Sequence, residues 1–336
     1  MKKIIISIIT VISLAGMKVS AQGCGGPVSD EGLKMFGFLQ AQYEYQMTDP
    51  AKNSFTFERA RIGAQGAIPY DFSYYVVLEL SPFISPNPYL LDAFISYNRY
   101  SWARVSMGSF KTPFGLETNT ACNDLITVYR TAATLQMVAP FRDLGMVLMG
   151  GNDNTFMTYQ FAIMNGSGLG RFDNNTKKDI VGRVVFKPLD FLRFGASFRY
   201  GYPSLNNTTD SRTTFGAELK ANYKNFKLMA EYINDKGNYN RDLGGGCSGN
   251  LIELGDKRSG YYATLAYMTK WNVEPVFRFD NFTSGNVDDY VENNMTFGVN
   301  YYFNDWTRLQ LNYVYRTEEL IEMQNDEVVV QLQVKF

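Results

Sequence analysis

Apolar and polar side chains alternate through residues 328–336, which read VVVQLQVKF. A period of two is the mark of a β-strand whose two faces meet different surroundings. The apolar face of such a strand packs on a protein core or, in an outer-membrane barrel, contacts lipid. This one strand does not distinguish the two environments, so the pattern of the rest of the chain is needed to decide between them.

The same alternation recurs along the whole chain. Residues 39–47, LQAQYEYQM, and residues 192–200, LRFGASFRY, are two further examples. An even number of alternating segments of about ten residues is typical of bacterial outer-membrane barrels. The pattern therefore predicts an all-β fold, a transmembrane antiparallel β-barrel of about sixteen strands. The predicted strands lie near 36–47, 55–68, 72–81, 89–99, 102–111, 144–151, 154–164, 179–187, 191–201, 213–224, 225–234, 259–269, 271–282, 295–304, 307–317 and 327–336.

The connections between these segments also alternate in length. Short ones are expected at 69–71, 188–190, 224–225, 270 and 304–305, and longer polar ones at 165–178, 202–212, 235–258 and 283–294. Short turns at one end and long loops at the other are typical of an outer-membrane barrel.

One connection, residues 112–142, is about thirty residues long and shows no alternation. A loop of this length is uncommon unless it is functional or disordered. Its apolar residues, which include Phe114, Leu125 and Val138, argue against disorder. We expect a loop that folds into the barrel and narrows it, since apolar side chains need a surface on which to pack. A cap over the mouth of the barrel is the alternative.

The N-terminus has the organisation of a secretory signal peptide. Lys2 and Lys3 precede an apolar stretch that is too short to span a bilayer, and small residues end at Ala21. We expect a signal peptide at 1–21, a periplasmic lead-in at 22–34 and the barrel at 35–336. Cys24 follows a poor lipidation motif, and a bridge between Cys122 and Cys247 is possible but not predictable from sequence.

Composition excludes several classes of protein. The 32 basic and 33 acidic residues nearly balance, which argues against nucleic acid as a partner. The chain has no histidine, so no Ser-His-Asp catalytic triad and no histidine-ligated metal site can form. We therefore expect no catalysis, no cofactor and no metal.

The sequence resembles the phosphate-selective porin O/P family. The resemblance rests on FERARIGAQGAIPYDFSYYVVLEL (57–80), VSMGSFKTPFGLE (105–117), FAIMNGSG (161–168), GVNYYF (298–303) and LQLNYVYR (309–316), in that order. It implies a sixteen-stranded barrel, usually a homotrimer in the outer membrane of a Gram-negative bacterium, with both termini in the periplasm. It also implies that the loop after Lys111 folds inward, and that Phe336 belongs to the signal read by the barrel-assembly machinery.

Alternation places several charged side chains on the inner face. We expect Arg59, Arg61, Glu79, Arg104, Arg199 and Lys220 to line the pore, because rings of charge set pore selectivity. The constriction residues expected in the loop are Lys111, Phe114, Glu117, Asp124, Arg130 and Arg142. The alternative is structural, since inward charges of both signs can neutralise one another across strands.

The expected function is passive diffusion of small polar or ionic solutes through a water-filled barrel in contact with outer-membrane lipid. Two alternatives stay open. One is a substrate-specific channel for phosphate or polyphosphate, which would favour a loop more basic than this one. The other is a structural or adhesive barrel that the loop plugs.

Overall fold

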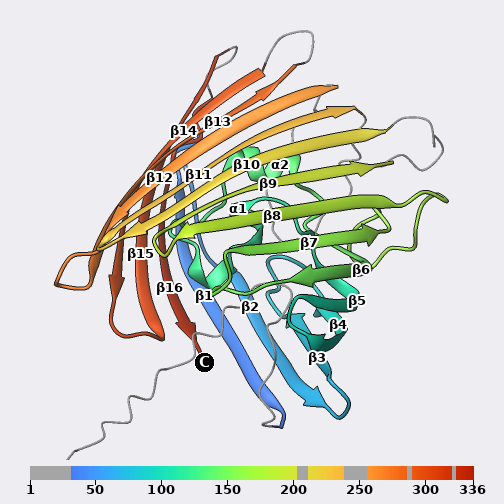
Figure 1. Ribbon diagram of the computed structural model, residues 1–336. Coiled ribbons are helices and arrows are strands. Elements are labelled where there is room, and N and C mark those ends of the chain that lie inside the picture. The colour runs from blue at the N-terminus through green and yellow to red at the C-terminus, as the bar shows by residue number, and fades with distance from the viewer. Residues whose placement is uncertain (1–31, 203–210, 238–255, 286–289, 320–322) are drawn as a thin grey trace, which may run out of the picture.

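The computed structural model describes residues 32–202, 211–237, 256–285, 290–319 and 323–336. These residues form a closed barrel in which every strand pairs antiparallel with its neighbours in sequence (Figure 1). The first strand, β1, pairs with both β2 and β16, so the barrel has no free edge. The predicted all-β barrel of about sixteen strands is therefore confirmed. The expected signal peptide, Cys24 and Cys247 lie outside the described residues.

The sixteen strands differ in length from eight to seventeen residues. They are β1 Lys34–Gln46, β2 Lys52–Ile68, β3 Phe72–Glu79, β4 Tyr89–Tyr100, β5 Ala103–Lys111, β6 Arg142–Gly150, β7 Met157–Met164, β8 Asp179–Leu189, β9 Leu192–Gly201, β10 Arg212–Tyr223, β11 Phe226–Gly237, β12 Lys257–Tyr267, β13 Val273–Ser284, β14 Tyr290–Tyr302, β15 Thr307–Glu318 and β16 Glu327–Lys335.

Some boundaries differ from the sequence prediction. The loop expected at 283–294 is shorter, because β13 extends to Ser284 and β14 begins at Tyr290. Glu292, Asn293 and Asn294 near the start of β14 are polar on both faces, so no alternation marks them. The turn expected at 188–190 also shrinks, since β8 continues to Leu189.

The two ends of the barrel carry different connections. The turns β2–β3, β4–β5, β8–β9 and β10–β11 are short, and the start of β1 and the end of β16 lie at the same end. We call this the short-turn end. The opposite end, the long-loop end, carries the connections that follow β3, β5 and β7.

Each strand presents an apolar face outward and a largely polar face inward. In β16, Leu332 and Val334 are exposed, whereas Gln331 and Gln333 between them are buried. A wide belt of exposed apolar side chains is unfavourable in water and favourable in hydrocarbon. The outer surface is therefore that of a membrane barrel.

The interior is not polar throughout, although the alternation of side chains predicts a polar inner face. Tyr75 of β3, Phe94 of β4 and Phe110 of β5 point inward and belong to one buried apolar cluster. The rings of Tyr75 and Phe94 are stacked with centroids 5.1 Å apart. The sequence pattern does not predict that these side chains point inward. Their strands are apolar on both faces over several residues, so the period of two is not visible.

Residues 112–141, the central segment, connect β5 to β6 and contain three short helices. These are α1 (Leu116–Asn119), the 3₁₀ helix η1 (Cys122–Asp124) and α2 (Ala132–Met137). The Thr131 side chain caps α2 by accepting a hydrogen bond from the Thr134 amide at 3.3 Å. Figure 1 shows α1 and α2 among the strands of the barrel. No helix of the described residues has the length and apolarity to cross a membrane.

Candidate functional site

A row of side-chain amides on the inner face of the barrel holds residues 122–128 of the central segment. Gln40 Nε2 donates to the Cys122 carbonyl at 3.3 Å, and Gln333 Nε2 donates to the Asn123 carbonyl at 3.0 Å. The Ile126 carbonyl accepts from two further amides at 2.9 and 3.1 Å, and the Val128 amide donates to a fifth at 2.8 Å. This amide row consists of Gln40 of β1, Asn300 of β14, Gln310 and Asn312 of β15 and Gln333 of β16.

Tyr129 continues this attachment towards the long-loop end. Its hydroxyl donates to Glu327 Oε1 at 3.2 Å and accepts from Gln42 Nε2 at 3.2 Å. Burial, followed by the nearby Glu327 and Glu44 carboxylates, raises the pKa of the Tyr129 phenol. The phenol therefore stays protonated at neutral pH and can donate this hydrogen bond.

Strands β9 and β13 hold the two ends of the central segment. The Gly115 amide donates to Ser197 Oγ of β9 at 2.9 Å, and the Ala132 amide donates to Asp280 Oδ1 of β13 at 3.0 Å. Arg199 Nη1 donates to the Val138 and Ala139 carbonyls at 2.9 and 2.8 Å. The central segment is thus held by a continuous arc of strands from β9 to β16 and β1, and it crosses the interior between β9 and β1, which lie opposite each other in the sixteen-stranded barrel.

The central segment is tightly packed inside the barrel. Of its 30 residues, 24 are buried and only Asp124 is exposed. Phe114 is 1% exposed and joins the apolar cluster on the inner wall. Any route past this level is consequently narrow in the conformation described here.

Four basic side chains gather where the central segment meets β2, β5 and β6. Arg61 Nη1 lies 3.1 Å from Cys122 Sγ, and Arg130 Nη2 donates to the Thr120 carbonyl at 3.2 Å. Lys111 Nζ donates to the same carbonyl at 3.2 Å, and Arg142 lines a narrow packing gap with Lys111 and Arg130. We call Arg61, Lys111, Arg130 and Arg142 the basic cluster.

Carboxylates neutralise part of the basic cluster. Arg61 Nε lies 2.6 Å from Glu79 Oε2. Arg142 forms a bidentate ion pair with Asp92, with distances of 2.9 and 3.2 Å. Among the described residues, no carboxylate lies within ion-pair distance of Lys111. The cluster therefore keeps a positive excess in a region of low dielectric, where its field is strong.

The acidic residues of the central segment are Glu117 and Asp124. Glu117 Oε2 accepts from the Thr131 amide and hydroxyl at 3.0 and 2.8 Å, and Asp124 is exposed.

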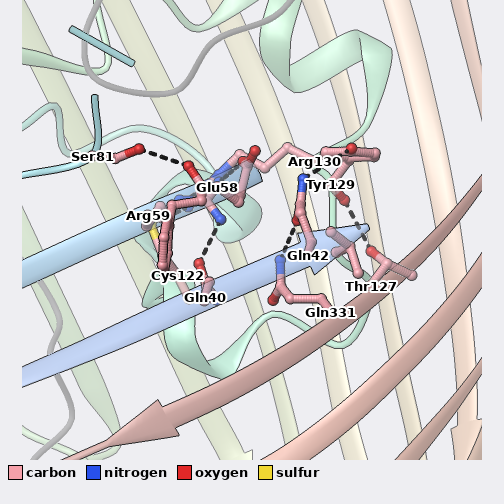
Figure 2. A network of polar contacts seen from close by, with 12 residues as sticks. Gln40, Gln42, Glu58, Arg59, Ser81, Cys122, Thr127, Tyr129, Arg130 and Gln331 are labelled. Atoms are coloured by element: carbon pink, nitrogen blue, oxygen red, sulfur yellow. Dashed lines mark hydrogen bonds and ion pairs between the residues drawn. The ribbon is translucent and has the colours of Figure 1, made fainter. Parts of the chain in front are cut away.

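The residues predicted to line the pore lie on the inner face, and most have specific partners. Arg59 pairs with Glu58 at 2.8 Å and donates to Gln40 at 2.9 Å, as Figure 2 shows beside Cys122. Arg104 Nη2 donates to the Gly151 carbonyl at 2.8 Å near the short-turn end. Lys220 is half-buried and has no ion pair among the described residues. Their contribution to permeation stays a prediction.

Phe336 lies beside β1 at the short-turn end. Its amide donates to the Gly37 carbonyl at 3.0 Å, and its carbonyl accepts from the Gly37 amide at 2.9 Å. A Cβ on Gly37 would lie 2.6 Å from the Phe336 ring, so the glycine leaves room for this ring. The role of Phe336 in membrane insertion stays a prediction.

The amide row and the anchors Ser197, Arg212 and Asp280 were not predicted. Arg212 donates to the Ala139 carbonyl at 2.7 Å and pairs with Asp235 at 2.9 Å. The available signal was the run of Gln and Asn at inward positions of the last strands. Uncharged amides suit a wall that must bind backbone carbonyls, because they donate without placing a charge in the interior.

The fold is shared with porins of known structure. An anion-selective porin from Comamonas acidovorans superposes with a TM-score of 0.72 at 13% identity, covering 91% of this chain and 99% of that one. The trimer form of the Vibrio cholerae outer membrane protein OmpT gives 0.67 at 11% identity, covering 90% and 99%. The Acinetobacter baumannii outer membrane channel DcaP gives 0.66 at 10% identity, covering 90% and 97%.

Comparison with curated proteins gives no sequence match. The model of the family described as phosphate-selective porin O and P matches residues 32–212, which is more than half of the chain. That span includes the strand that carries Arg59 and Arg61 and the whole central segment. The chain therefore belongs to the phosphate-selective porin O and P family.

Proposed function

We propose that this porin lets small polar or ionic solutes diffuse across the outer membrane along a route narrowed by the central segment. The observation that carries the proposal is that hydrogen bonds hold residues 112–141 both to β1 and to β9, on opposite sides of the barrel. A segment held in this way limits the size of a permeating solute while the barrel around it stays rigid.

A preference for anions is the selectivity that the charges favour. Lys111, at the end of β5, and Arg130 of the central segment both donate to the Thr120 carbonyl, whereas Glu117 lies 3.7 Å from Arg278 of β13. Fixed cations at a constriction attract anions and repel cations. Phosphate is a candidate solute within this class, and Arg59, Arg61, Arg104, Arg199 and Lys220 would extend the positive field along the route.

We further propose that the barrel assembles as a homotrimer in contact with outer-membrane lipid and that the assembly machinery recognises its last strand. The exposed apolar belt supports lipid contact. The trimer form of the Vibrio cholerae OmpT barrel, which has the same fold, supports the oligomeric state.

Single-channel recording in a planar bilayer tests the function. We expect stepwise currents, a reversal potential in a KCl gradient of the sign that chloride preference gives, and lower current when phosphate is added. A folded barrel that yields no steps would instead support a plugged structural or adhesive barrel. The sign of the reversal potential decides the selectivity independently of the existence of a channel.

A further inference from the structure

Inward carboxylates gather at the long-loop end on four strands that are contiguous in the closed barrel. They are Glu44 of β1, Glu292 of β14, Glu318 of β15 and Glu327 of β16, each within four residues of that end of its strand. Glu44 accepts from Thr56 Oγ1 at 2.9 Å, and Glu292 accepts from Asn294 Nδ2 at 2.7 Å. Neither has an ion pair among the described residues.

One base lies among these carboxylates, since Arg316 pairs with Glu327 at 3.0 Å. The charges at inward positions on this stretch of wall therefore sum to an excess of negative charge. We call Glu44, Glu292, Glu318 and Glu327 the acidic mouth.

Inward bases gather at the opposite, short-turn end. They include Arg193 of β9, Lys220 of β10, Lys227 of β11, Arg308 of β15 and Lys335 of β16, each within four residues of that end of its strand. Glu274 is the inward carboxylate placed in the same way, and it pairs with Lys227 at 2.6 Å. We call the five bases the basic mouth.

Within the basic mouth, Lys220 and Arg193 are directly opposite one another on paired strands. Like charges in this position destabilise a sheet, so packing alone does not account for them. The repulsion is reduced in part because Arg193 pairs with Asp153 of a neighbouring turn at 3.0 Å. Lys335 faces the same interior, because its register partner Phe38 points inward.

We infer that the channel is electrically polar along its axis and therefore rectifies ionic current. The inference rests on the proposed conducting function. The acidic mouth enriches cations and the basic mouth enriches anions, because charged walls raise the local concentration of counter-ions.

The direction of rectification follows from the placement of the charges. When the solution at the long-loop end is positive, cations enter from the acidic mouth and anions enter from the basic mouth, so both accumulate inside. When the polarity is reversed, cations must enter at the basic mouth and anions must enter at the acidic mouth. Each mouth repels the ions that enter there, so both kinds of ion are depleted inside the channel. Current is therefore larger with the long-loop end positive.

The test is the current–voltage curve of the full-length channel in symmetric KCl. Protein is added to one chamber, so that the short-turn end leads during insertion and the long polar loops, which are costly to move through lipid, stay behind. We expect a roughly twofold ratio of currents at opposite voltages in about 0.1 M salt, falling towards one in about 1 M salt, where the Debye length shrinks from about 10 to about 3 Å.

Variants assign the effect to the two mouths. Arg193→Gln with Lys220→Gln should reduce the ratio, and Glu44→Gln with Glu292→Gln should reduce it independently. Lys224→Gln with Lys270→Gln is the matched control, because these lysines lie at the short-turn end over outer aromatic rings and should leave the ratio unchanged. Retention of heat-modifiable migration on gels shows that each variant is a folded barrel.

The outcomes separate this inference from the proposed function. Channel steps with equal currents at both polarities in low salt would overturn the inference and leave the diffusion channel in place. An absence of steps from folded protein would overturn both. Rectification that the control pair abolishes while both mouth pairs leave it intact would also overturn the assignment to the mouths.

Discussion

The Arg61 guanidinium and the Glu79 carboxylate form an ion pair of 2.6 Å in which the two side chains are 4% and 0% exposed. The pair links β2 to β3, and the second Glu79 oxygen accepts from the Ala60 amide at 2.9 Å. Arg61 also reaches Cys122 Sγ, so one side chain joins the barrel wall to the central segment. Arg61 therefore has a structural role in addition to its place in the basic cluster.

Replacement of Glu79 by Gln should destabilise the barrel strongly. It leaves a buried guanidinium without its carboxylate, a change that typically costs about 3–5 kcal/mol. The measurement is the free energy of unfolding in detergent, followed by loss of heat-modifiable migration in denaturant. Asp71→Asn is the control, because its pair with Arg99 is exposed and such pairs contribute about 0–1 kcal/mol. Equal losses in the two variants would contradict the role of the buried pair.

Removal of Lys111, at the end of β5, and Arg130 of the central segment should weaken anion preference. Lys111→Gln with Arg130→Gln deletes the positive excess of the basic cluster without deleting a strand. We expect the reversal potential in a KCl gradient to move towards that of a channel without preference. Lys270→Gln, in an outer turn, should leave it unchanged. A double variant with unaltered reversal potential would show that ions pass elsewhere.

Deletion of Thr118–Thr134 should raise single-channel conductance severalfold. This stretch contains the residues held by the amide row and the start of α2, so its loss empties the interior at that level. Conductance is read from the size of current steps in KCl. Steps of the wild-type size from a folded deletion variant would show that the stretch does not limit the route.

Cys122 should resist thiol reagents in the folded barrel, because it is 3% exposed beneath Gln40. The measurement is the rate of maleimide labelling in a Cys24→Ser, Cys247→Ser background. Gln40→Ala with Gln333→Ala removes the two hydrogen bonds from these side chains to the central segment, of about 1 kcal/mol each, which should raise the opened population, and the labelling rate, about thirtyfold. Fast labelling of the background protein itself would place Cys122 in contact with solvent.

Much of the barrel could be predicted from local sequence. A strand with one lipid-facing side and one inward side must alternate, and Leu332, Gln331 and their neighbours do so without reference to any distant residue. The prediction failed where the period was hidden, as at Tyr75 and Phe94, whose strands are apolar on both faces. It also failed at Glu292 and Asn294, where both faces are polar.

The candidate site was predicted only in part. Lys111, Arg130 and Arg142 were identified by their residue type, but their proximity to Arg61 depends on how residues 112–141 fold back on β2. The amide row assembles side chains from β1, β14, β15 and β16, which are up to 293 positions apart in the chain. No local pattern carries such a relationship.

The sequence by itself determined most of the strands and which of their faces point inward and outward, because these follow from residue type and spacing along one stretch of chain. Only the tertiary structure decided which inward charges are neutralised, where the central segment is held and which charges share a mouth of the barrel. Those properties depend on distances between strands remote in sequence. Closure of the barrel and the path of residues 112–141 establish these distances.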